Sequence, residues 1–336
     1  MKVILDCLAS IFAETKLIDF EVIISDNGST DDSLAKIRAL FPTARIVEND
    51  ANLGFAAGNN AGIRVAQGKY VLILNPDTIV RDRALEKLVS YADRHPEAGA
   101  FGCRVLNPDG SFQNPARPIP TVFGYLIATL CLRWLGRFSN AFASNLYPGW
   151  EGRTERTIGY QSGCCIMVRG DLLRSLGGFD EQFFYHFEES DLCCRIWKSG
   201  SSIRFCPDAE VTHLGGQSVG RFPIRFALET YRGLYRYFYK HHGKKDLFRV
   251  RRVMLLNLWT RQIGYCLISV FKPKTVSQDR LNMYRVLIDW NTRLNPVRFI
   301  ENGEEPDVGY EPLAPASRRS TRLPDNPEKQ LVQQGK

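Results

Sequence analysis

The chain has 336 residues, of which 44% are hydrophobic and 24% are charged. This composition excludes an intrinsically disordered protein and provides enough apolar residues for a sizeable core. The formal net charge is +8, but it is unevenly distributed, because residues 220–300 carry 17 lysine and arginine residues against 4 acidic residues. That segment has a net charge of +13, so the basic character belongs to an appendage rather than to the core.

The cysteines and the apolar segments indicate the cellular compartment in which we expect the protein. None of the 9 cysteines has the CxxC spacing that a zinc site or redox pair needs, so we expect buried thiols in a reducing, cytoplasmic compartment. The first apolar stretch contains Asp6, which argues against a secretory signal. Residues 121–136 and 253–271 approach the length of a membrane span, but Arg133 and Arg261 interrupt them, so we expect interfacial or core helices there.

Strands and helices alternate along the first two thirds of the chain. The sequence predicts a helix over residues 4–16, a strand ending at Asp26 and a helix capped by Ser29 or Thr30. A strand in ARIVEND (44–50) and a glycine-rich loop entering a helix from residue 52 follow. The last two predicted elements are a strand in KYVLILNPDT (69–78) and a helix in DRALEKLVSYADRHP (82–96). This order predicts an α/β fold with a mostly parallel, Rossmann-like sheet flanked by helices.

The alternation loosens after residue 99. The sequence predicts a strand and turn over 99–113, an irregular stretch over 115–155, a strand and helix over 161–180, a loop and helix over 183–200, and two short strands with a turn over 202–216. We therefore expect one α/β domain over residues 1–219, a basic amphipathic helical segment over 220–300 and a disordered tail over 301–336.

The basic segment interleaves Tyr231, Tyr235, Tyr237 and Phe238 with arginines. This pattern is typical of a helix on an anionic membrane surface, but a helix packed on a protein core also fits it. A nucleic-acid surface is the third alternative, and no nucleic-acid motif accompanies the pattern. We therefore expect peripheral membrane association and no nucleic-acid partner.

Acidic and histidine residues follow predicted strands or open a predicted helix. The candidates are Asp26, Asp77, the cluster Glu188, Glu189 and Asp191, and His213. The three carboxylates of the cluster are close in sequence, so they repel one another unless a cation, a sugar hydroxyl or a proton relieves the repulsion. Each candidate also has a structural explanation: the two aspartates as turn residues, the cluster as an acidic first helical turn, and the histidine as a packed loop residue.

Taken together, these segments resemble one family. Seven segments look like successive blocks of family 2 glycosyltransferases, the inverting GT-A enzymes. In chain order they are FEVIISDNGSTD, NLGFAAGNNAGI, YVLILNPDT, LNPDGS, SGCCIMVRGD, LGGFDEQFFYHFEESDLCCRI and VTHLGGQS. The resemblance extends from about residue 4 to about residue 245 and is strongest to the branch that contains rhamnosyltransferases of cell-surface polysaccharide assembly. It implies a GT-A fold and transfer of a sugar from a nucleotide-sugar donor.

The resemblance also implies roles for residues on the donor side. Asp26, with Asn27 beside it, matches the position that contacts the nucleotide base. Gly58 and Asn60 lie in the stretch that matches a loop near the nucleotide and its phosphates. Asn75 and Asp77 match the first and last positions of the metal-binding DxD motif, so one carboxylate is missing here.

Two further roles follow from the resemblance. His213 matches a histidine that joins the shell of the divalent metal, Mg²⁺ or Mn²⁺, in some relatives. Glu189 matches the catalytic base position, with Glu188 and Asp191 flanking it, although relatives usually have aspartate where Glu189 stands. Asp191 is therefore the alternative base. A metal held by Asp77 and His213 would neutralise the charge that builds on the leaving diphosphate.

The resemblance implies a first strand ahead of the helix at residues 4–16, and the chain given begins inside that helix. Loss of that strand is expected to expose the edges of its neighbours and to remove contacts to the nucleotide base.

The combined interpretation is a glycosyltransferase at the inner, cytoplasmic face of the cell membrane. It would transfer a sugar, possibly rhamnose from dTDP-rhamnose, to a lipid-linked or polysaccharide acceptor. The main alternative is a degenerate nucleotide-sugar-binding or scaffold protein without turnover, and a nucleic-acid-binding protein is a third hypothesis that depends on the basic segment alone.

Overall fold

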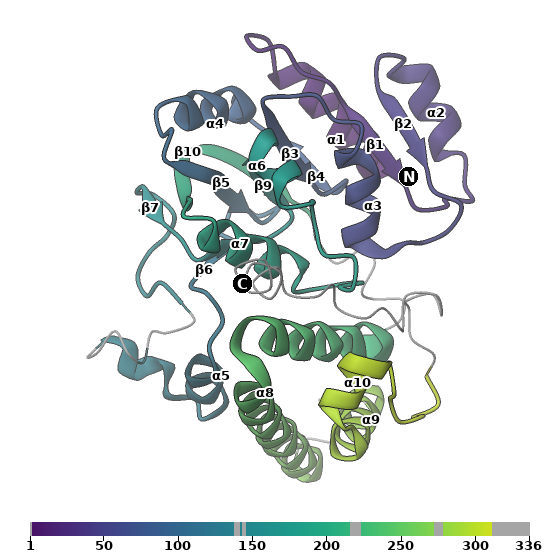
Figure 1. The fold of residues 1–336 in the computed structure, drawn as a ribbon, viewed down its shortest axis with the longest axis vertical. Coiled ribbons are helices and arrows are strands. Elements are labelled where there is room, and N and C mark those ends of the chain that lie inside the picture. The colour runs from purple at the N-terminus through teal and green to yellow at the C-terminus, as the bar shows by residue number, and fades with distance from the viewer. Residues whose placement is uncertain (1, 138–141, 143–145, 216–222, 272–277, 311–336) are drawn as a thin grey trace, which may run out of the picture. The chain divides into compact units, whose positions relative to one another are not determined.

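The computed structural model describes residues 2–137, 142, 146–215, 223–271 and 278–310. The chain divides into two compact units, Met1–Pro223 and Ile224–Lys336 (Figure 1). The first unit contains every candidate site residue. The predicted tail over 301–336 lies outside the described residues beyond residue 310, and its first two residues belong to a helix.

The first unit contains a mixed β-sheet. In the described residues this sheet has six strands, namely β3 (Tyr70–Leu74), β9 (Cys165–Arg169), β5 (Ala98–Leu106), β10 (Ser202–His213) and β4 (Thr78–Val80) in spatial order, with β7 (Arg156–Thr157) paired to β10. Two smaller ladders are formed by β1 (Ile23–Asp26) with β2 (Arg45–Glu48) and by β6 (Ala116–Arg117) with β8 (Tyr160–Gln161). Across the described residues, β1 pairs only with β2 and β3 only with β9, so each has one edge without a strand partner.

The α/β class is confirmed, but the prediction of a mostly parallel sheet is wrong. Among the described ladders, β1–β2 and β5–β10 are parallel, whereas β3–β9, β5–β9, β4–β10, β7–β10 and β6–β8 are antiparallel. The sequence could not show this, because a strand buried on both faces reads as the same apolar run in either direction.

Eight helical segments of the first unit accompany these strands in the described residues. They are α1 (Lys2–Glu14), α2 (Ser33–Leu40), α3 (Gly54–Ile63), α4 (Ala84–Asp93), α5 (Val122–Thr129), the 3₁₀ helix η1 (Leu132–Arg137), α6 (Gly170–Ser175) and α7 (Glu188–Lys198). The predicted helices at 4–16 and 82–96 are confirmed as α1 and α4.

Three local predictions are wrong. The helix α2 begins at Ser33, so neither Ser29 nor Thr30 caps it, because the chain is still in the turn that follows β1. Gly58 and its neighbours up to Gly62 are helical within α3 rather than a loop. Residues 202–213 form one strand, β10, whose pairing to β5 shifts register between Cys206 and Glu210, where the sequence predicts a turn.

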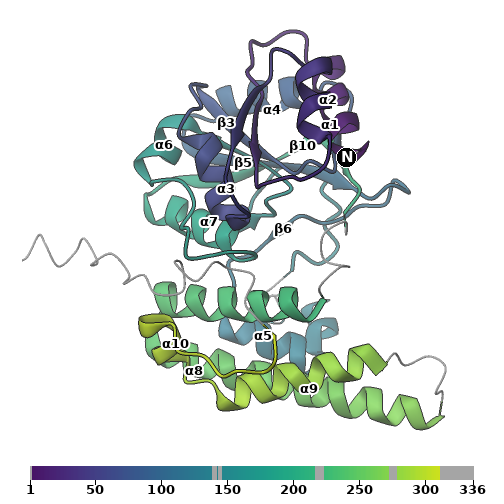
Figure 2. The ribbon, with the colours of Figure 1, turned by 90° about the vertical axis from the view of Figure 1, so that its right-hand side faces the viewer.

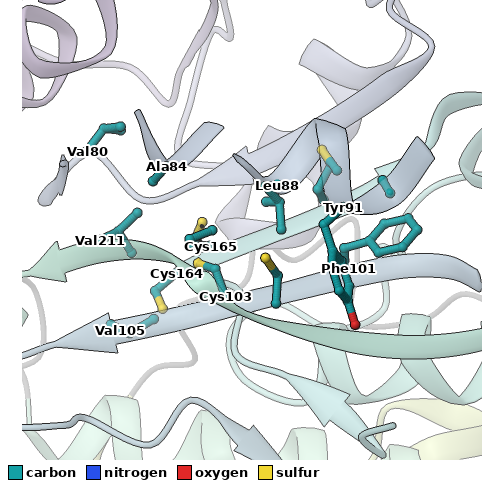
Figure 3. Packing of buried hydrophobic residues seen from close by; sticks show 14 of the residues in the cluster. Val80, Ala84, Leu88, Tyr91, Phe101, Cys103, Val105, Cys164, Cys165 and Val211 are labelled. Atoms are coloured by element: carbon teal, nitrogen blue, oxygen red, sulfur yellow. Dashed lines mark hydrogen bonds between the residues drawn. The ribbon is translucent and has the colours of Figure 1, made fainter. Parts of the chain in front are cut away.

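The sheet is covered on both faces. In β9, Cys165 and Met167 belong to the core that α1 and α4 cover, while Ile166 and Val168 belong to the core that α3, α6 and α7 cover. Figure 3 shows part of the first core, in which Phe101, Cys103 and Val105 project from one face of β5. Successive side chains of a strand point to opposite faces, so each of these apolar strands contributes side chains to both cores.

Most of the cysteines are packing residues. Seven are buried, including the adjacent pairs at 164–165 and 193–194, as the sequence predicts. Cys131 and Cys266 are exposed, which corrects the expectation that all are buried. Burial raises the pKa of the Cys193 thiol to about 12, so this side chain acts as a small apolar residue.

The second unit is helical. It contains α8 (Pro223–Phe271), α9 (Gln278–Arg293) and α10 (Pro296–Asn302), and α8 is broken at Gly243, whose φ of 79° is not helical (Figure 2). Gly243 separates α8 into two limbs. Within the described residues, no helix combines the length and the apolar character that crossing a membrane requires.

The aromatic residues of the first limb are core residues. Tyr235 stacks on Trp290 of α9 with ring centroids 6.1 Å apart, and both side chains are fully buried. Tyr231, Tyr237 and Phe238 are buried as well. The basic, aromatic pattern of this limb therefore reflects packing, which is the second of the alternatives that the sequence leaves open.

Candidate active site

The loop Asn75–Asp77 joins β3 to β4. The Asn75 backbone N–H donates to the carbonyl of Cys164, 3.0 Å away, and the Thr78 N–H donates back to the carbonyl of Asn75 at 3.2 Å. Pro76 fixes φ at the middle of this tight reversal. The loop therefore holds Asp77 just past the end of β3, between that strand and β4.

Antiparallel pairing brings His213 to Asp77. The strand β4 pairs with the end of β10, so that His213 lies opposite Thr78, and the Leu214 N–H donates to the carbonyl of Asp77 at 2.9 Å. The His213 Nε2 and the Asp77 Oδ1 are 3.2 Å apart, and the two side chains are 16% and 13% exposed. Two residues 136 positions apart in sequence thus form one partly buried pair.

A hydrogen-bond chain fixes the His213 ring. Asn107 donates from Nδ2 to Ser111 Oγ at 2.8 Å, so its Oδ1 accepts from Gln113 Nε2 at 2.9 Å. Gln113 Oε1 then lies 2.8 Å from His213 Nδ1 and can only accept. Nδ1 therefore carries a ring proton and donates to Gln113, which leaves Nε2 to face Asp77.

This arrangement fits a divalent cation. His213 Nε2 and the Asp77 carboxylate oxygen, 3.2 Å apart, can share one electropositive group, either a proton on Nε2 or a metal ion. Ligands bound at about 2.1 Å to one Mg²⁺ or Mn²⁺ stand roughly 3 Å apart, so the observed spacing suits two ligands of one ion. Burial by itself raises the pKa of Asp77, but the hydrogen bond and charge of His213 outweigh it and hold that pKa below its usual value.

The protein supplies few ligands itself. Among the described residues, no group of three or more His, Cys, Asp and Glu side chains could hold a metal ion. Mg²⁺ sites commonly use one or two carboxylates and take their remaining ligands from substrate phosphates and water. The Asp77–His213 pair therefore suits an ion that arrives with a phosphorylated substrate.

Glu188 and Glu189 open α7 after a strained turn. His186 and Phe187 both have positive φ angles, 66° and 72°, which are unfavourable for residues with side chains and mark a conformation that the surroundings impose. Burial lowers the pKa of His186 to about 4, so that ring is neutral near neutral pH. The turn places Glu189 beside Gly163, which precedes β9.

Glu189 lies beside Gly163. The backbone N–H of Gly163 lowers the pKa of the Glu189 carboxyl, against the larger effect of burial. A Cβ at Gly163 would stand 3.0 Å from the Phe55 ring, so a larger residue there would require that ring to shift. Glu189 Oε2 is buried without a hydrogen-bond partner in the described part of the chain.

The surroundings of Glu188 and Glu189 raise the pKa values of both side chains. Burial raises the pKa of Glu189 above its usual value, and burial together with the charge of Glu189 raises the pKa of Glu188 well above it. Glu188 Oε2 also has no hydrogen-bond partner within the described segments. A carboxylate with a raised pKa and an unpaired oxygen is a suitable acceptor for a substrate proton.

Gly163 and Cys164 connect the two halves of the site. The carbonyl of Cys164 accepts from the Asn75 N–H, and the adjacent Gly163 lies against Glu189, whose Cβ is 3.9 Å from the position that a Cβ at Gly163 would take. Burial raises the pKa of the Cys164 thiol to about 12, and the charges of Glu189 and Asp77 both contribute to that shift. Both carboxylates therefore lie close enough to Cys164 to act on it, at one end of the sheet.

Asp191 has a different environment. It is fully buried, and its Oδ2 pairs with Arg195 Nε at 2.8 Å. The Arg195 guanidinium also donates to the carbonyls of Leu176 and Gly178, at 2.9 and 2.8 Å. The pair therefore ties α7 to the turn that follows α6, which is a structural function.

The donor-side candidates at the end of β1 are engaged with one another. Asp26 Oδ2 accepts from the N–H groups of Gly28 and Ser29 at 3.1 and 3.0 Å, so Asp26 fixes this turn. Asn27 donates to the carbonyl of Gly54 at 3.0 Å. A Cβ at Gly58 would stand 2.8 Å from Asn27 Nδ2, so a larger residue there would displace the Asn27 side chain.

The Asn60 side chain connects α3 to the segment before α7 by hydrogen bonds. Its Nδ2 donates to the carbonyl of Phe179 at 2.8 Å, and its Oδ1 accepts from the Phe179 N–H at 2.8 Å. Its Nδ2 also donates to Glu181 at 3.1 Å. The structure thus uses both amide atoms of Asn60 for internal contacts.

The sequence interpretation missed Gln113 and Gly163. Gln113 follows the NPDG turn at residues 107–110, and its N–H donates to the carbonyl of Val105 at 2.9 Å as the chain folds back along β5. The turn signal was readable, but it does not reveal that the returning side chain meets His213. Gly163 stands at a bend just before the β9 run, where a glycine commonly marks a close approach.

The structure shows an α/β protein in which the Asp77–His213 pair and the two glutamates that open α7 lie at one end of a sheet. A model described as "Glycosyl transferase family 2" matches residues 1–176. The chain belongs to this family and is a glycosyltransferase of the rhamnosyltransferase-like branch.

Individual relatives agree with this placement. The chain is 31% identical over 236 residues to an N-acetylglucosaminyl-diphospho-decaprenol L-rhamnosyltransferase of Mycobacterium tuberculosis, covering 66% of this chain and 75% of that protein. It is 22% identical over 168 residues to the rhamnosyltransferase WbbL of Escherichia coli, covering 48% of this chain and 60% of that protein.

A solved structure supports the GT-A fold. The mannosyltransferase PcManGT from Pyrobaculum calidifontis, in complex with GDP-Man and Mn²⁺, matches with a TM-score of 0.52 and 18% identity over 90% of this chain and 84% of that one. At this identity the similarity shows the fold alone.

Proposed function

We propose that this glycosyltransferase transfers rhamnose from a nucleotide donor, dTDP-rhamnose, to a lipid-linked or polysaccharide acceptor, with inversion at the sugar carbon. The observation that carries the proposal is that Glu189 and the Asn75–Asp77 loop lie against two adjacent residues, Gly163 and Cys164, at one end of the sheet. The M. tuberculosis relative, whose printed name is that of a rhamnosyltransferase acting on a diphospho-decaprenol acceptor, supports the choice of sugar and acceptor.

Asp77 and His213 are proposed to hold a divalent metal, Mg²⁺ or Mn²⁺, with the donor pyrophosphate. The 3.2 Å spacing of their ligand atoms and the orientation that Gln113 gives to His213 support this role. When bound, the ion neutralises charge on the leaving diphosphate. Asn75 Nδ2, 3.4 Å from His213 Nε2, is positioned to help orient the pair.

Glu189 is proposed to be the catalytic base. Inversion requires a group that takes the proton of the acceptor hydroxyl as this oxygen attacks the sugar carbon and the bond to the diphosphate breaks. The raised pKa of Glu189, caused by burial, matches that task. Glu188 beside it is proposed to tune this proton affinity, whereas Asp191 is paired with Arg195 and is the less suitable alternative.

The residues at the end of β1 are proposed to form the nucleotide side of the pocket. Asp26 and Asn27 shape the turn against which the base would lie, and Gly58 allows α3 to meet it. Asn60 is proposed to act through the position of α3, since its amide is engaged with Phe179.

The domain assignment and the location are also proposals. We propose that residues 1–219 are the transferase domain and that the basic segment 220–300 associates peripherally with the cytoplasmic face of the membrane, where a lipid-linked acceptor is found. The degenerate, non-catalytic alternative is not favoured, because the chain matches the glycosyltransferase family model and is similar to relatives that are named rhamnosyltransferases.

The test compares the wild-type chain with Asp77→Asn in transfer assays with dTDP-rhamnose, UDP-glucose and GDP-mannose. We expect dTDP-rhamnose to be the preferred donor and the variant to lose at least about 100-fold in kcat/KM, because it removes one charged metal ligand. A thermal-shift titration with Mn²⁺ and dTDP checks binding separately, since a ligand that binds only the folded state raises the melting temperature. Preference for another donor would refute the sugar assignment, and full activity of the variant would refute the metal site.

A further inference from the structure

The second limb of α8 carries large apolar side chains on its surface. Leu256, Trp259, Ile263 and Leu267 are 42%, 49%, 55% and 57% exposed. Soluble proteins tolerate single exposed apolar residues, but a contiguous group marks an interaction surface. These four residues are called the α8 stripe below.

The stripe occupies one face of the helix. Its members are separated by three, four and four positions, which confines them to about a quarter of the helix circumference. Arg249 and Arg252, both exposed, lie on the same face one to two turns nearer Gly243. The face is therefore basic at its beginning and apolar over its remaining length.

The opposite side of this limb is already packed within the second unit. Leu258 is buried, and the Tyr265 ring lies 5.5 Å from that of Tyr284 in α9. Arg251 donates to the carbonyl of Asn291 at 2.6 Å. The contacts with α9 thus explain the orientation of the limb and leave the stripe facing outward.

We propose that the α8 stripe docks the protein on an anionic lipid surface, with Trp259, Ile263 and their neighbours inserted at the boundary between headgroups and acyl chains. This inference rests on the proposed function, in which the acceptor is lipid-linked, and it names the face that meets the lipid. Tryptophan favours that boundary, and arginines beside an apolar face add attraction to lipid phosphates.

Charge complementarity favours a lipid surface over a second copy of the chain. Residues 220–300 carry a net charge of +13, so two copies facing each other through this segment would bring like charges together. An anionic bilayer supplies the opposite charge and an apolar layer. The binding is therefore expected to weaken with salt, as attraction between exposed charges does.

The experiment is flotation of the full chain with vesicles of neutral phosphatidylcholine and with vesicles that also contain phosphatidylglycerol. We expect binding to the anionic vesicles, at least about ten-fold weaker in the double variant Trp259→Gln/Ile263→Gln, because the variant removes two apolar side chains from the face that enters the bilayer. The matched control is Leu17→Gln/Leu40→Gln, which removes two side chains of 72% and 62% exposure from the first unit and is expected to bind as wild type.

Three outcomes would overturn the inference: no binding of the wild-type chain, equal binding of the stripe variant, or a concentration-dependent dimer that the stripe variant loses. Transfer to a water-soluble acceptor analogue is measured on the same samples. The stripe variant is expected to retain it, so that failure of membrane docking is distinguishable from failure of the proposed transferase site.

Discussion

Asp77 and Glu189 are both partly buried carboxylates, yet their surroundings shift their pKa values in opposite directions. Burial raises both, but His213 supplies a hydrogen bond and charge that bring Asp77 below its usual value. Glu189 has no such partner, and burial leaves its pKa raised. One carboxylate is thereby kept ionised and suited to a cation, and the other is suited to a proton. The predictions below test this division, from the largest expected effect to the smallest.

Glu189→Gln is expected to lower kcat by about 100-fold to 10,000-fold, because the amide cannot accept the acceptor proton. Donor binding, followed by thermal shift with dTDP and Mn²⁺, is expected to persist. In the wild type, kcat/KM is expected to fall as pH decreases through the raised pKa of Glu189, so the acid limb lies above the usual range for glutamate. A variant with normal turnover would exclude Glu189 as the base.

Gln113→Leu is expected to weaken Mn²⁺ binding by about 10-fold to 100-fold, since it removes the acceptor that orients the His213 ring. The measurement is the Mn²⁺ dependence of the thermal shift in the presence of dTDP. Gln113→Glu keeps an acceptor oxygen at the same place and is the matched control, expected to retain most of the affinity. Equal weakening in both variants would indicate a general packing defect instead.

Asp191→Asn is expected to cost about 3 kcal/mol of unfolding free energy, because it leaves Arg195 without its buried counter-charge. Chemical denaturation measures this loss, and the folded fraction is expected to keep its specific activity. Asp171→Asn, which changes a fully exposed partner of Arg174, is the control and should have little effect. A stable but inactive Asp191→Asn protein would instead support Asp191 as the base.

Glu188→Gln is expected to stabilise the protein by about 1 kcal/mol near neutral pH. Burial and Glu189 raise the pKa of Glu188, so the folded state binds its proton more tightly than the unfolded state does. Its contribution to stability is therefore present below the unfolded pKa and is lost as pH rises through the folded value. Melting curves across pH should show the gain shrinking in acid, whereas Glu151→Gln, on a 70% exposed side chain, should show none.

The sequence predicted those parts of the site that depend on local order. The apolar run of β3 ending at Asn75 and the acidic start of α7 were both readable, because burial and helix formation leave periodic patterns. The meeting of His213 with Asp77 was not readable, because it depends on β4 pairing antiparallel to β10. The role of Gln113 depends in turn on that pairing, so no local pattern could indicate it.

The basic segment shows the same limit. Aromatic residues between arginines predicted a membrane-facing helix, and the structure buries Tyr235 against Trp290 instead. The exposed apolar residues lie in the other limb of α8, beyond Gly243. Composition alone cannot tell these limbs apart, because which face is covered depends on where α9 packs.

The most direct test of the central claim is a crystal of the full chain soaked with Mn²⁺ and dTDP, with the metal located by its anomalous scattering. The account predicts one ion within about 2.5 Å of both the Asp77 carboxylate and His213 Nε2, with the Glu189 carboxylate facing the same pocket. An ion bound away from both residues, or Glu189 on a separate surface, would contradict it.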